Sequence, residues 1–245
     1  VLRDASDLAG SAIDGFYGLE ARAHGAGWLS PIPEEHRELL GGAMITGLSS
    51  GHPIISRLSV GPSAHLVSLD DIVGGVDPIP TTALLDYSLG APLHPDLSND
   101  EGDNDLWTHL SRAVFGFVVP GTRTYATFGS SGGHGPRGVC YKCVPDGLDS
   151  ECAGYCSRDP EDRSLRYWFF DLNDLAAVRA GERAPSDVRP YAHGPFESPF
   201  VDARPQMGGG AWDAERGLLY LTMTGADREQ GTYSNPPVVV AFRLR

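Results

Sequence analysis

The chain has 245 residues, of which 41% are hydrophobic, so it is long enough to bury the core of one large domain or two small ones. Its formal net charge is −13, and because a phosphate backbone is bound by clustered Lys and Arg, we expect no nucleic-acid partner. No stretch approaches the roughly 18 apolar residues of a membrane span, and the 31 Gly and 19 Pro residues are typical of a loop-rich β architecture.

The first half of the chain predicts short strands joined by turns, with one helix. Residues 33–40 (PEEHRELL) place a Pro and two Glu at their start, which predicts a helix of about two turns. Apolar runs of about six residues between turn signals then predict strands over residues 43–48, 64–69, 113–119 and 124–129.

The second half predicts the same kind of structure. Residues 167–171 predict a strand, and residues 173–180 a short helix that begins at an Asn cap and ends at Gly181. Residues 208–244 predict a strand, a hairpin turn at 213–217, a strand over 217–224, a polar loop and a last strand over 237–244.

A weak internal repeat suggests how these strands are organised. Residues 64–72 and 167–175 both show an apolar strand that leads into an Asp- or Asn-rich turn. We therefore expect an all-β, β-propeller-like domain over residues 1–245, with about four to five blades' worth of antiparallel sheet.

All four cysteines lie in one loop insertion, placed at residues 140–162. Cys140, Cys143, Cys152 and Cys156 have the spacing C-x2-C-x8-C-x3-C. Two disulfides that pin a surface loop are the plainer interpretation, and they predict a secreted or periplasmic protein, since disulfides persist in oxidising compartments. The alternative is a four-thiolate zinc site, which the spacing of the first pair favours. The sequence does not fix the pairing.

Several phrases together resemble a group of bacterial secreted, β-propeller-like proteins to which no activity is assigned. They are WLSPIP from Trp28, LGGAMITG from Leu40, PIISRLSVGPSA from Pro53, PGTRT from Pro120, FGSSGGH from Phe128, WFFDLNDL from Trp168 and VRPY from Val188. Members of the group are usually longer, so the resemblance implies that this chain is a C-terminal portion and that blades precede Val1. It implies no chemistry.

An acidic run at residues 96–105 is the best metal candidate. Calcium takes about six to eight oxygen ligands from a flexible loop, and Asp100, Asp103 and Asp105 offer carboxylates for it. The spacing is not that of an EF-hand. The alternative is a solvated acidic loop that binds nothing, and no other cofactor is predicted.

One group of candidate ligand-binding residues surrounds a predicted strand. His52, Arg57 and His65 belong to it. Arg57 lies among apolar neighbours, where a guanidinium is costly unless it meets a carboxylate or a ligand anion. The alternative is a structural ion pair.

A Gly-rich loop and a polar loop supply the remaining candidates. Residues 129–135 (GSSGGHG) let backbone N–H groups approach a ligand, and His134 is placed to act as a general base, with Tyr141 nearby in sequence. Residues 226–237 carry Glu229, Tyr233 and Asn235, and a Tyr ring beside an amide suits a sugar. Each loop has a plain alternative, a turn that needs glycines and a polar surface loop.

Two functions follow from these residues. The first is a secreted domain that binds a small molecule, a glycan or a partner, with His52, Arg57, His134, Tyr233 and Asn235 as ligand contacts. The second is an extracytoplasmic hydrolase or lyase acting on a polysaccharide or ester, with Arg57, His134, Tyr141 and Glu229 as catalytic candidates. No pair of catalytic residue types has motif-level spacing, which favours the binding domain.

Overall fold

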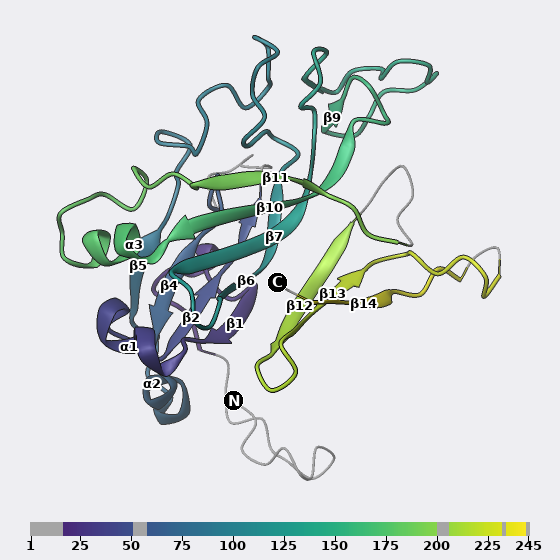
Figure 1. Ribbon diagram of the computed structural model, residues 1–245. Coiled ribbons are helices and arrows are strands. Elements are labelled where there is room, and N and C mark those ends of the chain that lie inside the picture. Colours follow the sequence, from purple (N-terminus) through teal and green to yellow (C-terminus); the bar gives the residue numbers. More distant parts are fainter. Residues whose placement is uncertain (1–16, 51–57, 200–205, 232–233, 244–245) are drawn as a thin grey trace.

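A computed structural model describes residues 17–50, 58–199, 206–231 and 234–243 as an all-β protein with few helices (Figure 1). The strands are β1 (Trp28–Pro31), β2 (Met44–Gly47), β3 (Ser49–Ser50), β4 (Ala64–Val67), β5 (Thr81–Leu85), β6 (Arg112–Val118), β7 (Thr124–Gly132), β8 (Val139–Tyr141), β9 (Tyr155–Ser157), β10 (Arg163–Asp171), β11 (Ala192–Phe196), β12 (Met207–Asp213), β13 (Leu218–Met223) and β14 (Val238–Arg243). The helices are the 3-10 turn η1 (Arg22–His24), α1 (Glu34–Leu40), α2 (Leu69–Gly74) and α3 (Leu172–Arg179). None of these helices is long and apolar enough to cross a membrane.

The strand predictions are confirmed at each segment named from the sequence. Residues 43–48, 64–69, 217–224 and 237–244 contain β2, β4, β13 and β14, and residues 113–119, 124–129 and 167–171 overlap β6, β7 and β10. β6 and β10 begin earlier than predicted, and β7 runs on to Gly132, so the first four residues of the predicted Gly-rich loop 129–135 are strand. The predicted hairpin turn at residues 213–217 joins β12 to β13, and the Asp213 carboxylate accepts the Arg216 backbone N–H at 3.0 Å. Apolar alternation therefore located the long strands correctly.

Two predictions needed correction, the cap of α3 and the structure that follows β4. The α3 cap is Asp171, whose side chain accepts the Asn173 backbone N–H at 2.8 Å, and not Asn173 as expected. Residues 64–72 were expected to form a strand followed by an Asp-rich turn. The strand β4 ends at Val67 as part of this pattern, but a helix follows it in place of the turn. There the Ser68 hydroxyl accepts the Asp71 backbone N–H at 3.3 Å and begins α2.

Three antiparallel sheets hold most of the chain. The first has the order β1-β2-β4-β5, the second β11-β10-β7-β6-β3 and the third β12-β13-β14. Apart from the short β3 and the β8-β9 insertion, the strands of each sheet follow one another in space in the order in which they occur in the sequence. The fourth sheet is the hairpin β8-β9 in the cysteine insertion, which is therefore more regular than expected.

The first strands of the three sheets meet at the centre of the molecule. β6 packs against β1 on one side and against β12 on the other (Figure 1). One continuous apolar core includes side chains from all three sheets, among them Trp28, Phe117, Trp168 and Leu221. Closure into a propeller is not seen among the described residues, and the number of blades stays a prediction.

Candidate functional site

A groove of about 470 Å³ opens where the first strands of the three sheets meet. We call it the junction groove. β1 contributes Leu29 to its lining, β6 contributes Phe115 and Phe117, and β12 contributes Ala211 and Trp212. The α1 end of the first sheet supplies the rim residues Glu35 and Arg37. The groove is therefore built from segments far apart in sequence.

Strand alternation and one glycine explain this shape. Phe115 and Phe117 are two residues apart in β6, so both side chains lie on the same face of the sheet. On β12 the close approach needs Gly210, because a Cβ there would lie 2.6 Å from Cδ1 of Phe115. The aromatic face of one sheet can thus lie directly against the backbone of another.

Trp212 adds a hydrogen-bond donor to the aromatic part of this lining. Its ring stacks on Phe117, with the ring centroids 5.2 Å apart and the planes 19° from parallel. Its indole Nε1 is buried and has no hydrogen-bond partner among the described residues. A buried donor without an acceptor costs about 1–3 kcal/mol, so a small movement of the ring that exposed this nitrogen to an acceptor would recover part of that cost.

The rim of the junction groove carries one charge of each sign. The Glu35 carboxylate accepts the Gly121 backbone N–H at 3.1 Å, and hydrogen bonds from its own N–H and from that of Gly121 lower its pKa. It is therefore an anion and an acceptor at neutral pH. Arg37 donates from Nε to the Ile32 carbonyl at 3.0 Å.

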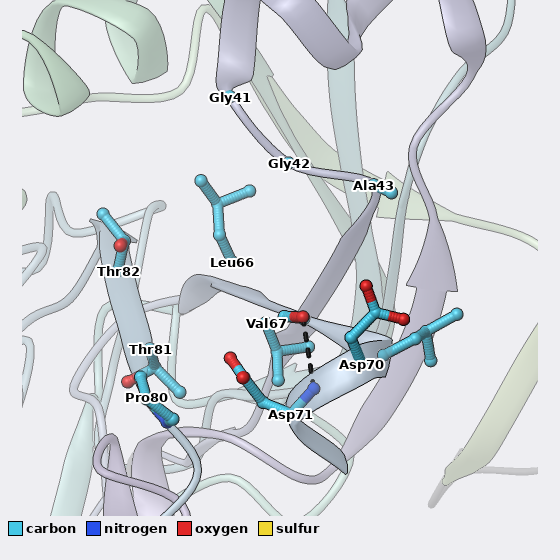
Figure 2. Close-up of a pocket in the computed structure, with 12 residues that line it drawn as sticks. Gly41, Gly42, Ala43, Leu66, Val67, Asp70, Asp71, Pro80, Thr81 and Thr82 are labelled. Carbon is cyan, nitrogen blue, oxygen red and sulfur yellow. Dashed lines mark hydrogen bonds between the residues drawn. The ribbon is translucent and has the colours of Figure 1, made fainter. Parts of the chain in front are cut away.

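A second hollow, of about 520 Å³, lies between the α1–β2 connection, the end of β4 and the start of β5. Figure 2 shows Asp70 and Asp71 on one side of it and Thr81 and Thr82 on the other. Both Asp residues belong to the first turn of α2, where a carboxylate stabilises the positive end of the helix dipole. The acidic groups of this hollow thus have a structural role already.

His134 lies in a chain of short hydrogen bonds at the end of β7. Its Nδ1 is 2.8 Å from the Asn104 carbonyl, which can only accept, so Nδ1 carries the proton. Its Nε2 is 2.7 Å from Oγ of Ser131, which in turn is 2.6 Å from Oγ of Ser111. A neutral His134 thus accepts from Ser131, which accepts from Ser111.

The surroundings keep this imidazole neutral. Burial is the largest cause that lowers the His134 pKa, to about 4, and the nearby Arg166 guanidinium adds to it. The buried Arg166 donates to the Asp105 carbonyl and, at 3.3 Å, to the Ser164 hydroxyl. A serine beside a neutral histidine resembles the start of a nucleophile–base pair, but Ser131 is only 3% exposed and lines neither cavity.

The predicted calcium ligands do not gather in the structure. Asp100, Asp103 and Asp105 are exposed, and within the described ranges the only metal-type cluster of three or more ligand atoms consists of cysteines. The loop is held instead by two buried asparagines, Asn99 and Asn104, whose side chains bond to backbone groups. Calcium binding stays a prediction.

The remaining candidates are dispersed. Tyr141 is exposed on β8 and faces Tyr155, and Glu229 and Asn235 are exposed on the β13–β14 loop, far along the third sheet (Figure 1). His65 is buried in β4, with its Nε2 3.9 Å from the Asp86 carboxylate that also binds His24. His52, Arg57 and Tyr233 lie outside the described residues. Neither the junction groove nor the second hollow is lined by His134, Tyr141 or Glu229.

Comparisons of this chain with protein-family models, with curated proteins and with solved structures find no match. The sequence reasoning missed Phe117 and Trp212, which line the junction groove. Two signals were present: the alternation in RAVFGFV and the three glycines directly before Ala211 and Trp212. Neither signal shows that the two strands meet.

Proposed function

We propose that this chain is a ligand-binding β domain whose site is the junction groove, and that its ligand is an uncharged sugar. The observation that carries the proposal is the aromatic lining of the groove, where the Trp212 ring stacks on Phe117 and its Nε1 has no hydrogen-bond partner among the described residues. A sugar ring offers an apolar face for the Phe117–Trp212 stack and hydroxyls that accept from the indole N–H.

The charges around the groove support the same class of ligand. A sugar hydroxyl both donates and accepts hydrogen bonds. At the rim, the Glu35 carboxylate can accept from it and the Arg37 guanidinium can donate to it. A polyanionic ligand is disfavoured by the net charge of −13. An aliphatic ligand would leave the indole N–H without an acceptor.

The position of the groove fits the propeller expectation. A propeller places the first strand of each blade around a central axis, and ligands bind where those strands meet. We propose that the three sheets are blades of such a fold and that the junction groove lies beside its axis. The two disulfides support a secreted or periplasmic location.

The proposal is tested by screening the full chain against a panel of neutral oligosaccharides and measuring the best binder by calorimetry. Trp212→Ala should weaken binding about tenfold or more, a loss of about 1.4 kcal/mol, because it removes the stacking face and the donor. Trp212→Phe, which keeps the ring, should lose less.

Tyr141→Ala is the matched control, since it removes an exposed aromatic ring from a different element. Its affinity should equal that of the unmodified chain. Equal affinity of the Trp212→Ala variant, or binding lost equally in both variants, would remove the junction groove as the site.

A further inference from the structure

The four cysteine sulfurs of the insertion lie together in one cluster. Cys140 and Cys143 form one disulfide, and Cys152 and Cys156 form the other. The two disulfides lie against each other, with Sγ of Cys156 at 3.5 Å from that of Cys143 and 3.8 Å from that of Cys140. A surface loop pinned by two independent bridges would not need this contact.

The distances between the two disulfides match those of a metal site. A zinc ion bound by four thiolates has Zn–S bonds of about 2.3 Å in a tetrahedron, which places neighbouring sulfurs about 3.8 Å apart. Three of the sulfurs already lie within 4.8 Å of one another, and the fourth, of Cys152, is bonded to one of the three. Four separated sulfurs can thus surround one ion with small side-chain movements.

The backbone holds this arrangement without help from the sulfur–sulfur bonds. Cys140 and Cys156 are direct partners in the β8–β9 ladder. The Cys152 backbone N–H donates to the Cys143 carbonyl at 2.9 Å, and the Lys142 N–H donates to the Gly154 carbonyl at 2.8 Å. None of these bonds involves a sulfur atom, so we expect them to keep the four side chains near one another when the disulfides are reduced.

Burial and charge also suit a metal centre. Cys140 and Cys156 are buried, whereas Cys143 and Cys152 are half-buried, which leaves an entry path. A zinc ion with four thiolates carries two negative charges. Lys142, the only lysine of the chain, lies between the first two ligands in sequence, and Arg158 lies two residues after the last, so positively charged residues flank the ligands along the chain.

We propose that the cysteine cluster is a zinc site of the reduced protein, with the disulfide form as its metal-free, oxidised state. A dithiol reductant gives two electrons and two protons to each disulfide and is itself oxidised to a disulfide. The four thiols then release their protons to water as one Zn²⁺ binds, and the ion keeps its oxidation state. Reduction thereby exchanges two covalent cross-links for one metal cross-link.

The test uses the full chain, purified with its disulfides and then divided into reduced and unreduced samples. Each sample is incubated with zinc, passed over a desalting column and assayed for metal by mass spectrometry. The expected result is about one zinc per chain after reduction and none before it. Cobalt in place of zinc should give the intense thiolate-to-metal absorption of a tetrahedral site.

A ligand variant, a control variant and an alkylation assay distinguish zinc bound by the four cysteines from zinc bound elsewhere. Cys152→Ser should lose most of the zinc, and Ser150→Ala, in the same exposed loop, should keep it. Zinc should also protect the four thiols of the reduced chain from alkylation, which is read by peptide mass even where a variant folds poorly. Reduced chain that binds no more zinc than the Cys152→Ser variant, or thiols that alkylate equally with and without zinc, would overturn the proposal.

Discussion

At the scale of single residues, the protein keeps His134 neutral by enclosing it. The backbone carbonyl of Asn104 fixes its tautomer, and Ser131 donates to its other nitrogen. Protonation would place two donors face to face at Nε2 and Ser131 and add a charge beside Arg166. Because these partners satisfy the ring completely, His134 contributes more to stability than to chemistry.

This enclosure predicts a pH-dependent stability. Between pH about 4, the folded-state pKa of His134, and 6.5, its ordinary pKa, the unfolded chain binds the proton and the folded chain does not. The contribution of His134 to the free energy of unfolding is therefore largest above pH 6.5. It decreases as the pH falls through that window, by about 3 kcal/mol in all. Urea unfolding of the wild type and of His134→Gln at several pH values measures it. Parallel curves for the two proteins would show that His134 is not responsible.

At the scale of elements, the acidic run is organised by amides and not by carboxylates. The Asn104 side chain donates to the carbonyls of Asp96 and Trp107, at 2.5 and 2.8 Å, and accepts from the N–H groups of Leu106 and Trp107. The segment that this clamp shapes covers one face of the second sheet, where Trp107 packs on Trp168 with ring centroids 5.0 Å apart.

We expect Asn104→Ala to destabilise the protein by about 2–4 kcal/mol, because several buried backbone groups lose their partners at once. Asp103→Ala, an exposed change in the same run, should stay within about 0.5 kcal/mol of the wild type. Chemical denaturation with both variants makes the comparison. A loss at Asp103 as large as that at Asn104 would instead indicate that the carboxylates hold the loop.

At the scale of the whole molecule, the junction of the three sheets depends on how closely their first strands approach. Gly210 of β12 lies so near β6 that an added Cβ would be 2.6 Å from Phe115 Cδ1 and 2.8 Å from the Tyr220 carbonyl oxygen. The shape of the groove and the packing of the third sheet against β6 therefore both require a glycine at position 210.

Gly210→Ala should cost about 1–3 kcal/mol and weaken sugar binding at the same time, because the third sheet must move outward. Gly74→Ala is its control, since nothing lies within 4 Å of a Cβ at the end of α2. That variant should be neutral or slightly more stable. Thermal unfolding and calorimetry of the two variants test the prediction, which fails if Gly210→Ala behaves like Gly74→Ala.

Local sequence signals predicted local structure well and the site poorly. The apolar runs of β6 and β7, the alternation of β13 and the Pro-Glu-Glu start of α1 placed these elements, because burial of both faces gives a run and burial of one face gives alternation. The short α2 was missed, since a Ser cap and two Asp residues also fit a turn. The acidic run suggested a metal because its Asp and Asn residues look the same in sequence whether their oxygens meet an ion, lie in solvent or, as with Asn99 and Asn104, bind backbone groups.

The all-β class, the positions of the long strands and the gathering of four cysteines in one insertion could be predicted from the sequence alone, because each depends on residues close together in the chain. Only the tertiary structure decided which strands meet, that Trp212 stacks on Phe117, and that the two cysteine pairs lie in contact. Phe117 and Trp212 are 95 positions apart and Cys143 and Cys156 are 13 apart, and the geometry of such contacts is set by how strands pair and pack, which no local pattern encodes.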